Sequence, residues 1–335
     1  MHPFIVESST QGIVLQECLK AYFVDGQKGL EEFVKLYRHG GYKRIVFSGM
    51  GSSYYAPFSV VGKLTENGIP AFVINAAELS GPQLGLIEKD TLLVAVSQSG
   101  NSLETVNLVN RLDRDDIVGV CNVMDSPMAQ KCRIILPILS GTEKFISSKS
   151  YLNTVAVLMM MTAALINEFN DSFKNQMQTL AEWATEYLKN VQAKRNEVMS
   201  FVEGTDIFDF IADHGSVATA YQACLIFREG PQFATYSNIT AEYSHGGYLL
   251  AKPGVTGFQF DPKAPKNTIE ENMRNYVLDK GGKVILITSA KDVESTDMLR
   301  VVRYPEVDAW LAPIAEALPV TTLMGWLLEV SNNAG

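Results

Sequence analysis

Cysteine and histidine are both scarce in this 335-residue sequence, with four of each. The cysteines have no short C-x-x-C spacing, which argues against a zinc site or a dithiol pair, and a chain of this size needs no disulfide staples. We therefore expect buried free thiols in a reducing compartment, with no metal and no cofactor. The four cysteines are Cys18, Cys121, Cys132 and Cys224.

The sequence also lacks a segment typical of export or of membrane insertion. Residues 1–10 contain no basic stretch followed by an apolar core, so we predict no signal peptide. The longest apolar segment, 155–166, is much shorter than the roughly 20 residues that cross a bilayer. We therefore expect a cytoplasmic protein that does not bind membranes.

Basic residues are fewer than acidic ones, 28 against 37, which gives a formal net charge of −9. An acidic chain without a basic tract is a poor match for nucleic acid, so we expect no nucleic-acid partner. A local positive site for a small anion is still compatible with this charge balance.

What the sequence does contain is a regular alternation of short apolar segments and helical patterns. Its length and its 47% hydrophobic content favour two domains. We predict an α/β fold with two domains, each a doubly wound, mainly parallel five-stranded sheet flanked by helices, joined by a long helix. Strands are predicted at 43–48, 71–75, 91–96, 117–121 and 133–137, and again at 206–211, 255–260, 283–288 and 299–303.

The expected domain divisions follow from this alternation. A helical lead-in, with a break near Asp25 and Gly26, precedes the first domain, and one amphipathic helix at 173–201 forms the link to the second. The divisions are 1–40 for the lead-in, 41–170 for the first domain, 171–204 for the link and 205–335 for the second domain.

The segment 91–105 is the strongest indication of a ligand site. An apolar strand stops at Ser97, polar and small residues follow, and a helix is predicted from Leu103. Small hydroxyl and amide donors at the carboxyl end of a strand, beside the free N–H groups of a helix, suit a phosphate monoester. The alternative is an ordinary capped helix after a buried strand. The candidate phosphate and sugar ligands are Ser97, Gln98, Ser99 and Ser102, with Gly51, Ser52 and Ser53 from a similar turn after strand 43–48.

Five sequence features occur in a recognisable order. They are GMGSSYYA at 49–56, AAELS at 76–80 with Glu78 on a predicted turn, SQSGNSLET at 97–105, GTE at 141–143 followed by Ser147 and Ser148, and the pair Glu229 and His245. Together they resemble the sugar isomerase (SIS) family, and specifically its double-SIS proteins, similar to the isomerase half of glucosamine-6-phosphate synthase and to fructosamine-6-phosphate deglycases. The resemblance implies two SIS domains over about residues 35 to 330 and adds Ser148 to the sugar site.

The resemblance also implies catalytic roles for two residues of the second half. Glu229 and His245 stand 16 positions apart, as the family's catalytic glutamate and histidine do, and Glu242 precedes the histidine by three. Glu229 would be the base that moves a proton between C1 and C2, and His245 would open the sugar ring, presented across the interface of a homodimer. From the residues alone, a structural glutamate at a helix end and a surface histidine are the alternatives.

Several positions depart from the family pattern. Met50 replaces a cysteine, Gly247 replaces the proline that usually follows the histidine and glycine, and Ile226 replaces a lysine. The family's C-terminal imine-forming lysine has no counterpart at 331–335, so Lys149 and Lys252 are the nearest substitutes. No glutaminase segment is expected ahead of the lead-in.

These observations predict a phosphosugar isomerase or deaminase that acts on an amino-sugar or fructosamine 6-phosphate without a glutaminase domain. A simple aldose–ketose phosphosugar isomerase is the second prediction. A non-catalytic phosphosugar-binding protein is the third, and the absence of a helix-turn-helix segment or a basic patch counts against it.

Overall fold

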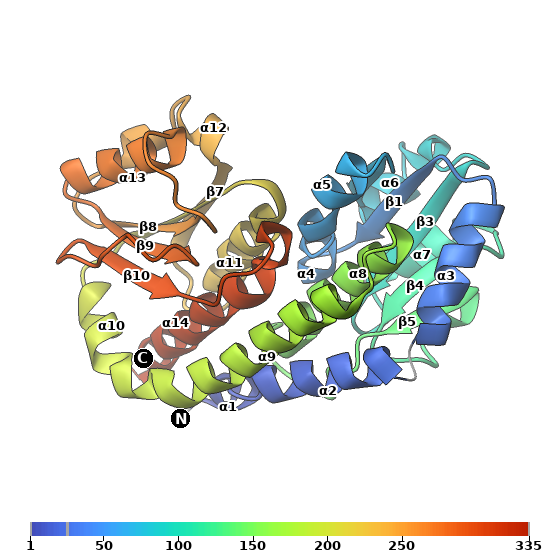
Figure 1. The fold of residues 1–335 in the computed structure, drawn as a ribbon, viewed down its shortest axis with the longest axis horizontal. Helices are drawn as coiled ribbons and strands as arrows, with labels where there is room; N and C mark the ends of the chain where they lie inside the picture. The colour runs from blue at the N-terminus through green and yellow to red at the C-terminus, as the bar shows by residue number, and fades with distance from the viewer. Residues whose placement is uncertain (1, 25–26, 334–335) are drawn as a thin grey trace. The chain divides into compact units, whose positions relative to one another are not determined.

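The computed structural model describes residues 2–24 and 27–333, so the predicted break at Asp25 and Gly26 lies outside the described residues. The chain divides into two compact units. The N-terminal unit comprises Ile13–Glu143 and Lys149–Gln178, and the C-terminal unit comprises Met1–Gly12, Lys144–Ser148 and Thr179–Gly335. Each unit is built on its own β-sheet (Figure 1).

The sheet of the N-terminal unit has five parallel strands in the order β2-β1-β3-β4-β5. Its central strand β3 is buried along its whole length, as expected for a continuous apolar run covered by helices on both faces. The strands are β1 (Arg44–Gly49), β2 (Ala71–Asn75), β3 (Thr91–Ser97), β4 (Val118–Cys121) and β5 (Ile134–Pro137).

The sheet of the C-terminal unit repeats this topology. Its five parallel strands lie in the order β10-β9-β8-β6-β7. Counted along the chain within each sheet, both orders are 2-1-3-4-5, so the predicted pair of parallel five-stranded sheets is confirmed. The strands are β6 (Ile207–Ala212), β7 (Ala234–Ile239), β8 (Val255–Phe260), β9 (Lys283–Thr288) and β10 (Leu299–Arg303).

Helices connect the strands and cover the sheets. The α-helices are α1 (Pro3–Ser8), α2 (Gln11–Val24), α3 (Gln27–His39), α4 (Ser52–Tyr55), α5 (Phe58–Glu66), α6 (Ala76–Ser80), α7 (Leu103–Leu112), α8 (Lys149–Leu165), α9 (Asp171–Val191), α10 (Arg195–Phe201), α11 (Val217–Glu229), α12 (Thr240–Tyr243), α13 (Ile269–Asp279) and α14 (Pro313–Asn333). The 3₁₀ turns are η1 (Leu84–Leu86), η2 (Ala129–Lys131), η3 (Gln192–Lys194), η4 (His214–Ser216), η5 (Gly247–Leu250) and η6 (Ala309–Leu311).

Two predicted elements differ in kind from the structure, and one strand was not predicted. The single helix expected at 173–201 is interrupted by η3, where the chain tightens into a 3₁₀ turn although no glycine or proline marks the place. The turn expected at 76–80 is the short helix α6, which Asn75 caps by accepting from the Ala77 amide at 3.0 Å. Strand β7 was not predicted, because an edge strand with the polar sequence ATYSNI has no apolar run.

Phenylalanine packing fixes the position of α11 against its sheet. The Phe227 ring of α11 lies 4.9 Å from Phe208 and 5.2 Å from Phe210, both on β6, between ring centroids. These contacts anchor the last turn of α11, at which Glu229 stands.

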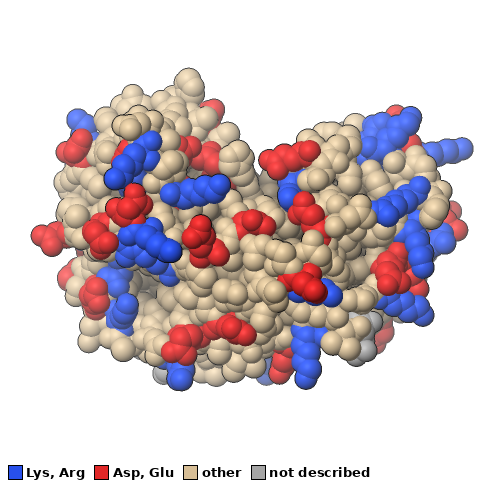
Figure 2. All heavy atoms as spheres, in the orientation of Figure 1, with Lys and Arg blue, Asp and Glu red and all other residues tan. Residues whose placement is uncertain are grey.

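One helical segment among the described residues, Ala309–Ser331, is long and apolar enough to cross a membrane by length and composition. It is longer than segment 155–166, the longest apolar segment noted in the sequence. Thr321, Thr322 and Gly325 interrupt its apolar run, but its mean hydropathy remains high. All of its most apolar window is buried within the protein. On the face shown in Figure 2, acidic and basic side chains are interspersed.

Candidate active site

The loop from β3 to α7 folds back on itself around Gly100. The Gly100 amide donates to the Ser97 side chain at 3.1 Å, and the Gly100 carbonyl accepts from the Met128 amide at 3.1 Å. The Gln98 carbonyl accepts from the amide of Asn122, which follows the neighbouring strand β4, at 3.0 Å. Sequence reasoning missed Asn122, whose only signal is a polar residue directly after an apolar strand.

Gly100 is required at this position for two reasons. Its φ of +63° lies in the left-handed region. A Cβ there would lie 1.9 Å from Ser126 Oγ and 3.0 Å from Cys121 Sγ. The loop can therefore take this path only with glycine. Cys121 itself is a free thiol, as are Cys18 and Cys224, all three buried, and the half-buried Cys132.

The N-terminus of α7 has no side-chain cap. Ser102 is its N-cap residue, but within the described part of the chain its side chain makes no capping hydrogen bond and instead donates to Glu104 Oε2 at 3.0 Å. The first-turn amides of a helix need partners, and an anion is a natural one. The half-buried side chains of Gln98 and Ser99 border the same turn.

A second loop, from β1 to α4, lies beside the first. Strands β1 and β3 are paired, with Ser48 opposite Ala95, so the residues after each strand meet at one edge of the sheet. A Cβ on Gly49 would lie 2.6 Å from the Val96 carbonyl oxygen, which shows how closely the two strands end together. Gly51 has a φ of +52° and starts α4.

This edge is where the strand order reverses, the usual ligand position in a doubly wound sheet. The structure thus brings together seven of the predicted ligand residues at one sheet edge. They are Gly51, Ser52, Ser53, Ser97, Gln98, Ser99 and Ser102.

The remaining residues of the predicted motifs lie elsewhere in the structure. Ser148 is fully buried in the C-terminal unit. Glu143 of the GTE segment caps α8, accepting from the Lys149 amide at 3.0 Å and from the Ser150 hydroxyl. Glu78 is exposed on α6. Lys252 is exposed in the turn before β8.

Glu229 is the last residue of α11 and lies at the amino end of the next strand, β7. Its side chain is exposed, yet neighbouring atoms desolvate the carboxylate enough to raise its pKa above the usual value. The adjacent Arg228 is engaged with β7: its Nε donates to Thr235 Oγ1 at 2.8 Å and its Nη2 to the Thr235 carbonyl at 2.6 Å.

His245 follows β7 and α12, so it lies at the opposite end of the same strand. Its amide donates to the Glu242 carbonyl at 2.9 Å and its side chain is exposed. Six strand residues separate the two ends, a length of roughly 16 Å. Within one chain, therefore, Glu229 and His245 stand on opposite edges of the sheet and do not form one cluster.

A family model describes the part of the chain that holds the two serine loops. The model of the SIS domain matches residues 41–166. Residues 41–166 are a SIS domain.

Beyond the SIS domain, the similarity extends along most of the chain. The chain is 24% identical over 307 residues to a glutamine–fructose-6-phosphate aminotransferase of Thermococcus kodakarensis, covering 87% of this chain and 50% of that protein. The chain spans about half the length of the curated relatives that it matches.

Solved structures share the fold. The C-terminal domain of a glucosamine-fructose-6-phosphate aminotransferase from Francisella tularensis superimposes with a TM-score of 0.85 at 18% identity, covering 99% of this chain and 97% of that one. A tagatose-6-phosphate ketose/aldose isomerase from Escherichia coli gives 0.81 at 14% identity (99% and 94% covered). A glucosamine-6-phosphate deaminase from Thermotoga maritima gives 0.76 at 18% identity (98% and 94% covered).

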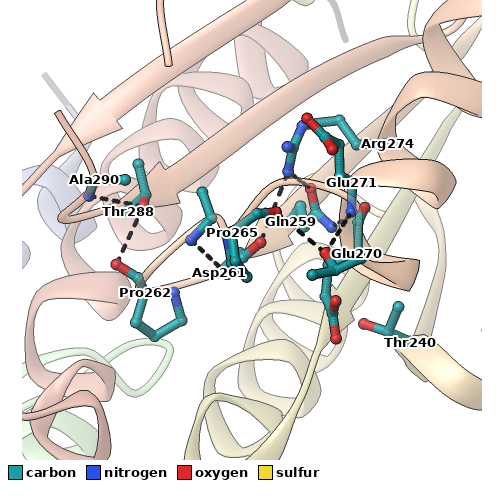
Figure 3. Close-up of polar contacts among 12 residues, drawn as sticks. Thr240, Gln259, Asp261, Pro262, Pro265, Glu270, Glu271, Arg274, Thr288 and Ala290 are labelled. Atoms are coloured by element: carbon teal, nitrogen blue, oxygen red, sulfur yellow. Dashed lines mark hydrogen bonds and ion pairs between the residues drawn. The ribbon is translucent and has the colours of Figure 1, made fainter. Parts of the chain in front are cut away.

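The C-terminal unit has buried polar groups at the same edge of its own sheet. Arg274 of α13 donates from Nη1 to Gln259 Oε1 at 2.7 Å, and the same nitrogen lies 3.8 Å from Asp261 Oδ2 (Figure 3). Helix α13 occupies the position that α7 has in the SIS domain, since each follows the third strand of its sheet. Unlike α7, it is capped: Thr268 accepts from the Glu271 amide at 3.4 Å, and Glu270 and Glu271 lie in its first turn.

Asp209, in the middle of β6, is a second residue that sequence reasoning missed. It is 1% exposed, and burial raises its pKa to about 6. Its Oδ1 accepts from Asn238 Nδ2 of β7 at 3.3 Å, and the Tyr243 hydroxyl lies close enough to favour its ionised form. Asp209 thereby links β6 to α12, two residues before His245. No group of three potential metal ligands occurs within 2–24 and 27–333.

Glu316 is fully buried, more so than Asp209 or Asp261 of the same unit. Its Oε1 accepts from Ser216 Oγ at 2.7 Å, and its Oε2 has no hydrogen-bond partner among the residues that the structure describes. Burial, with a smaller contribution from Asp261, raises its pKa from 4.5 to about 8. Glu316 is therefore mostly neutral at pH 7.

Replacing Glu316 with glutamine is expected to change how stability depends on pH. Because the folded-state pKa lies above the unfolded value, the stability that the neutral carboxyl contributes is full below about pH 4 and is lost as pH rises through about 8. Between about pH 5 and pH 8 the wild type should lose about 3 kcal/mol of unfolding free energy relative to Glu316→Gln. Urea unfolding of both proteins at a series of pH values measures the two free energies. If both free energies changed equally with pH, the prediction would be wrong.

Proposed function

We propose that this protein is a phosphosugar isomerase or deaminase that acts on a hexose 6-phosphate carrying an amino group at C1 or C2, as in glucosamine 6-phosphate or a fructosamine 6-phosphate. The observation that carries the proposal is the uncapped N-terminus of α7 beside the serine loop Ser97–Ser102. A phosphate monoester supplies the acceptors that these amides and hydroxyls need. Gly51, Ser52 and Ser53 would complete the cradle from the neighbouring strand end.

In the proposed mechanism Glu229 is the base. It removes a proton from C2 of the open-chain amino-aldose, or from C1 of the amino-ketose, and returns it to the other carbon. The result is an imine, and water hydrolyses it to the free amine and a ketose or aldose 6-phosphate. A raised pKa suits a group that must both take and return a proton near neutral pH.

His245 would open the ring by giving a proton to the ring oxygen while taking one from the anomeric hydroxyl. Because Glu229 and His245 stand at opposite ends of β7, we propose that they meet across the interface of a homodimer, one from each subunit. The shared strand order of the two sheets supports a second proposal, that the C-terminal unit is also a SIS domain. We also propose that Ser148 lines the sugar site, as the family resemblance implies.

A product assay tests the reaction. Purified protein is given glucosamine 6-phosphate, several fructosamine 6-phosphates and, separately, glucose and fructose 6-phosphates. We expect release of ammonia or amine with one equivalent of sugar phosphate. Interconversion of glucose and fructose 6-phosphates without any amine release would replace the proposal with a simple isomerase, an activity class to which a structural neighbour belongs.

A Ser99→Ala variant separates substrate binding from chemistry, since it removes one proposed phosphate ligand and leaves the proposed base intact. It should raise KM more than it lowers kcat. If phosphosugars raise the melting temperature of the wild type but no substrate turns over, the proposal fails in favour of a binding protein.

A further inference from the structure

The C-terminal unit contains a cavity of about 150 Å³ between one face of its sheet and the helices that cover it. Its floor is a row of three residues in register across three strands, Phe258, Ile285 and Arg300. Residues of α9, α10 and α14 form the cover (Figure 1). A cavity of this volume is large enough for a molecule the size of benzene.

Two buried hydrogen-bond donors of α14 line this cavity. Trp326 is 1% exposed and Thr322 is 8% exposed, and their spacing of four puts them on one face of the helix. Trp326 Nε1 and Thr322 Oγ1 have no hydrogen-bond partner among residues 2–24 and 27–333. The Thr322 side chain lies beside the Tyr187 hydroxyl and favours the ionised form of that group. An unpaired buried donor destabilises the protein, and a ligand with acceptor atoms would remove that cost.

The charged residues at this cavity are all basic. Lys194, Arg300 and Arg303 line it, and no aspartate or glutamate does so among the described residues. Arg303 is engaged elsewhere, because its Nε donates to the Ala290 carbonyl at 3.1 Å. Arg300 uses Nη1 for Glu197, at 2.7 Å, and retains Nη2 and Nε for another acceptor. Its positive charge favours the ionised form of the Tyr187 hydroxyl, and Tyr187 lines the same cavity.

We propose that this cavity binds a small monocarboxylic acid with a planar or branched apolar body of about benzoate size. The carboxylate pairs with Arg300 and accepts hydrogen bonds from Thr322 and Trp326. The body packs against Phe258, Ile285 and Val191. This proposal is independent of the phosphosugar reaction, since every residue involved lies in the C-terminal unit, away from the serine loops of the SIS domain.

Benzoate titrated into ¹⁵N-labelled protein tests the proposal. The sequence has three tryptophans, so three indole N–H signals are expected, and Trp326→Phe assigns one of them. Benzoate should shift the Trp326 indole signal saturably and bind at least about tenfold more tightly than neutral benzyl alcohol. Arg300→Gln should abolish that preference, and the isosteric Thr322→Val should weaken benzoate binding severalfold.

Arg195→Gln is the control, because Arg195 also forms an ion pair, with Glu329 at 2.7 Å, but does not line the cavity. It should leave benzoate binding unchanged. The proposal is overturned if millimolar benzoate does not shift the Trp326 signal, or if Arg300→Gln and Arg195→Gln bind benzoate equally well. If Trp326→Phe does not fold, the Arg300→Gln comparison still decides, measured calorimetrically.

Discussion

Mixing Glu229→Gln subunits with His245→Asn subunits is expected to restore about a quarter of wild-type turnover, although each variant alone loses about 10²–10⁴-fold. The reason is the position of β7, a strand of roughly 16 Å in length, which follows Glu229 and precedes His245 within one chain. If each proposed active site takes Glu229 from one subunit and His245 from the other, a mixed dimer has one site with both native residues. Half of the dimers in a random mixture are mixed, which gives the expected quarter.

Co-expression with two different affinity tags isolates the mixed dimers, which should reach about half of wild-type turnover because one of their two sites is native. A mixture of two Glu229→Gln preparations with different tags is the control and should stay inactive. If mixed dimers of the two variants are as inactive as each parent, the two residues do not act together across an interface. Wild-type turnover by either single variant would remove that residue from the proposed mechanism.

Replacing Gly100 with alanine is expected to weaken phosphosugar binding about a hundredfold or more and to destabilise the protein by about 2–4 kcal/mol. Alanine is strained at a φ of +63°, and its Cβ would overlap the Ser126 side chain. The loop would have to move, which displaces the amides and hydroxyls proposed to hold the phosphate. Thermal shift with glucosamine 6-phosphate and urea unfolding measure the two effects.

Gly62→Ala is the matched control, because Gly62 lies in helix α5 and a Cβ there meets nothing within 4 Å. It should leave affinity unchanged and raise stability slightly. Adding Ser126→Gly to Gly100→Ala removes the nearest overlapping atoms and should recover part of the stability. Full affinity in Gly100→Ala would show that this loop does not hold the phosphate.

Strands with continuous apolar sequence could be located from the sequence alone. β2, β8, β9 and β10 have the predicted bounds, and β3 differs by one residue. β3 and β9 are largely buried and mostly apolar, as expected of parallel strands covered on both faces. The edge strands β2 and β10 are only partly buried. The serine loop could be found for a related reason: an abrupt change from apolar to small polar residues marks where such a strand ends. Its uncapped helix could not be predicted, since Ser102 looks like an ordinary cap.

The relation between Glu229 and His245 could not be predicted. Their spacing of 16 gives no distance in space, and the strand that separates them was not recognised. β7 is an edge strand whose side chains include Thr235, Tyr236 and Asn238, so neither alternation nor an apolar run identified it. The pairing of Asp209 with Asn238 depends on β7 in the same way.

The contrast between α7 and α13 bears on how one topology supports two different roles. Both helices start at the same place in equivalent sheets, and each presents a positive helix end. α13 neutralises its end with Thr268, Glu270 and Glu271 from its own sequence, and so carries a built-in counter-ion. α7 has one acidic residue in its first turn, Glu104, but no side-chain cap. If the proposed phosphate binds there, a molecule from solution supplies what α13 takes from its own sequence, and a few residues at the start of one helix distinguish a receptor from a scaffold.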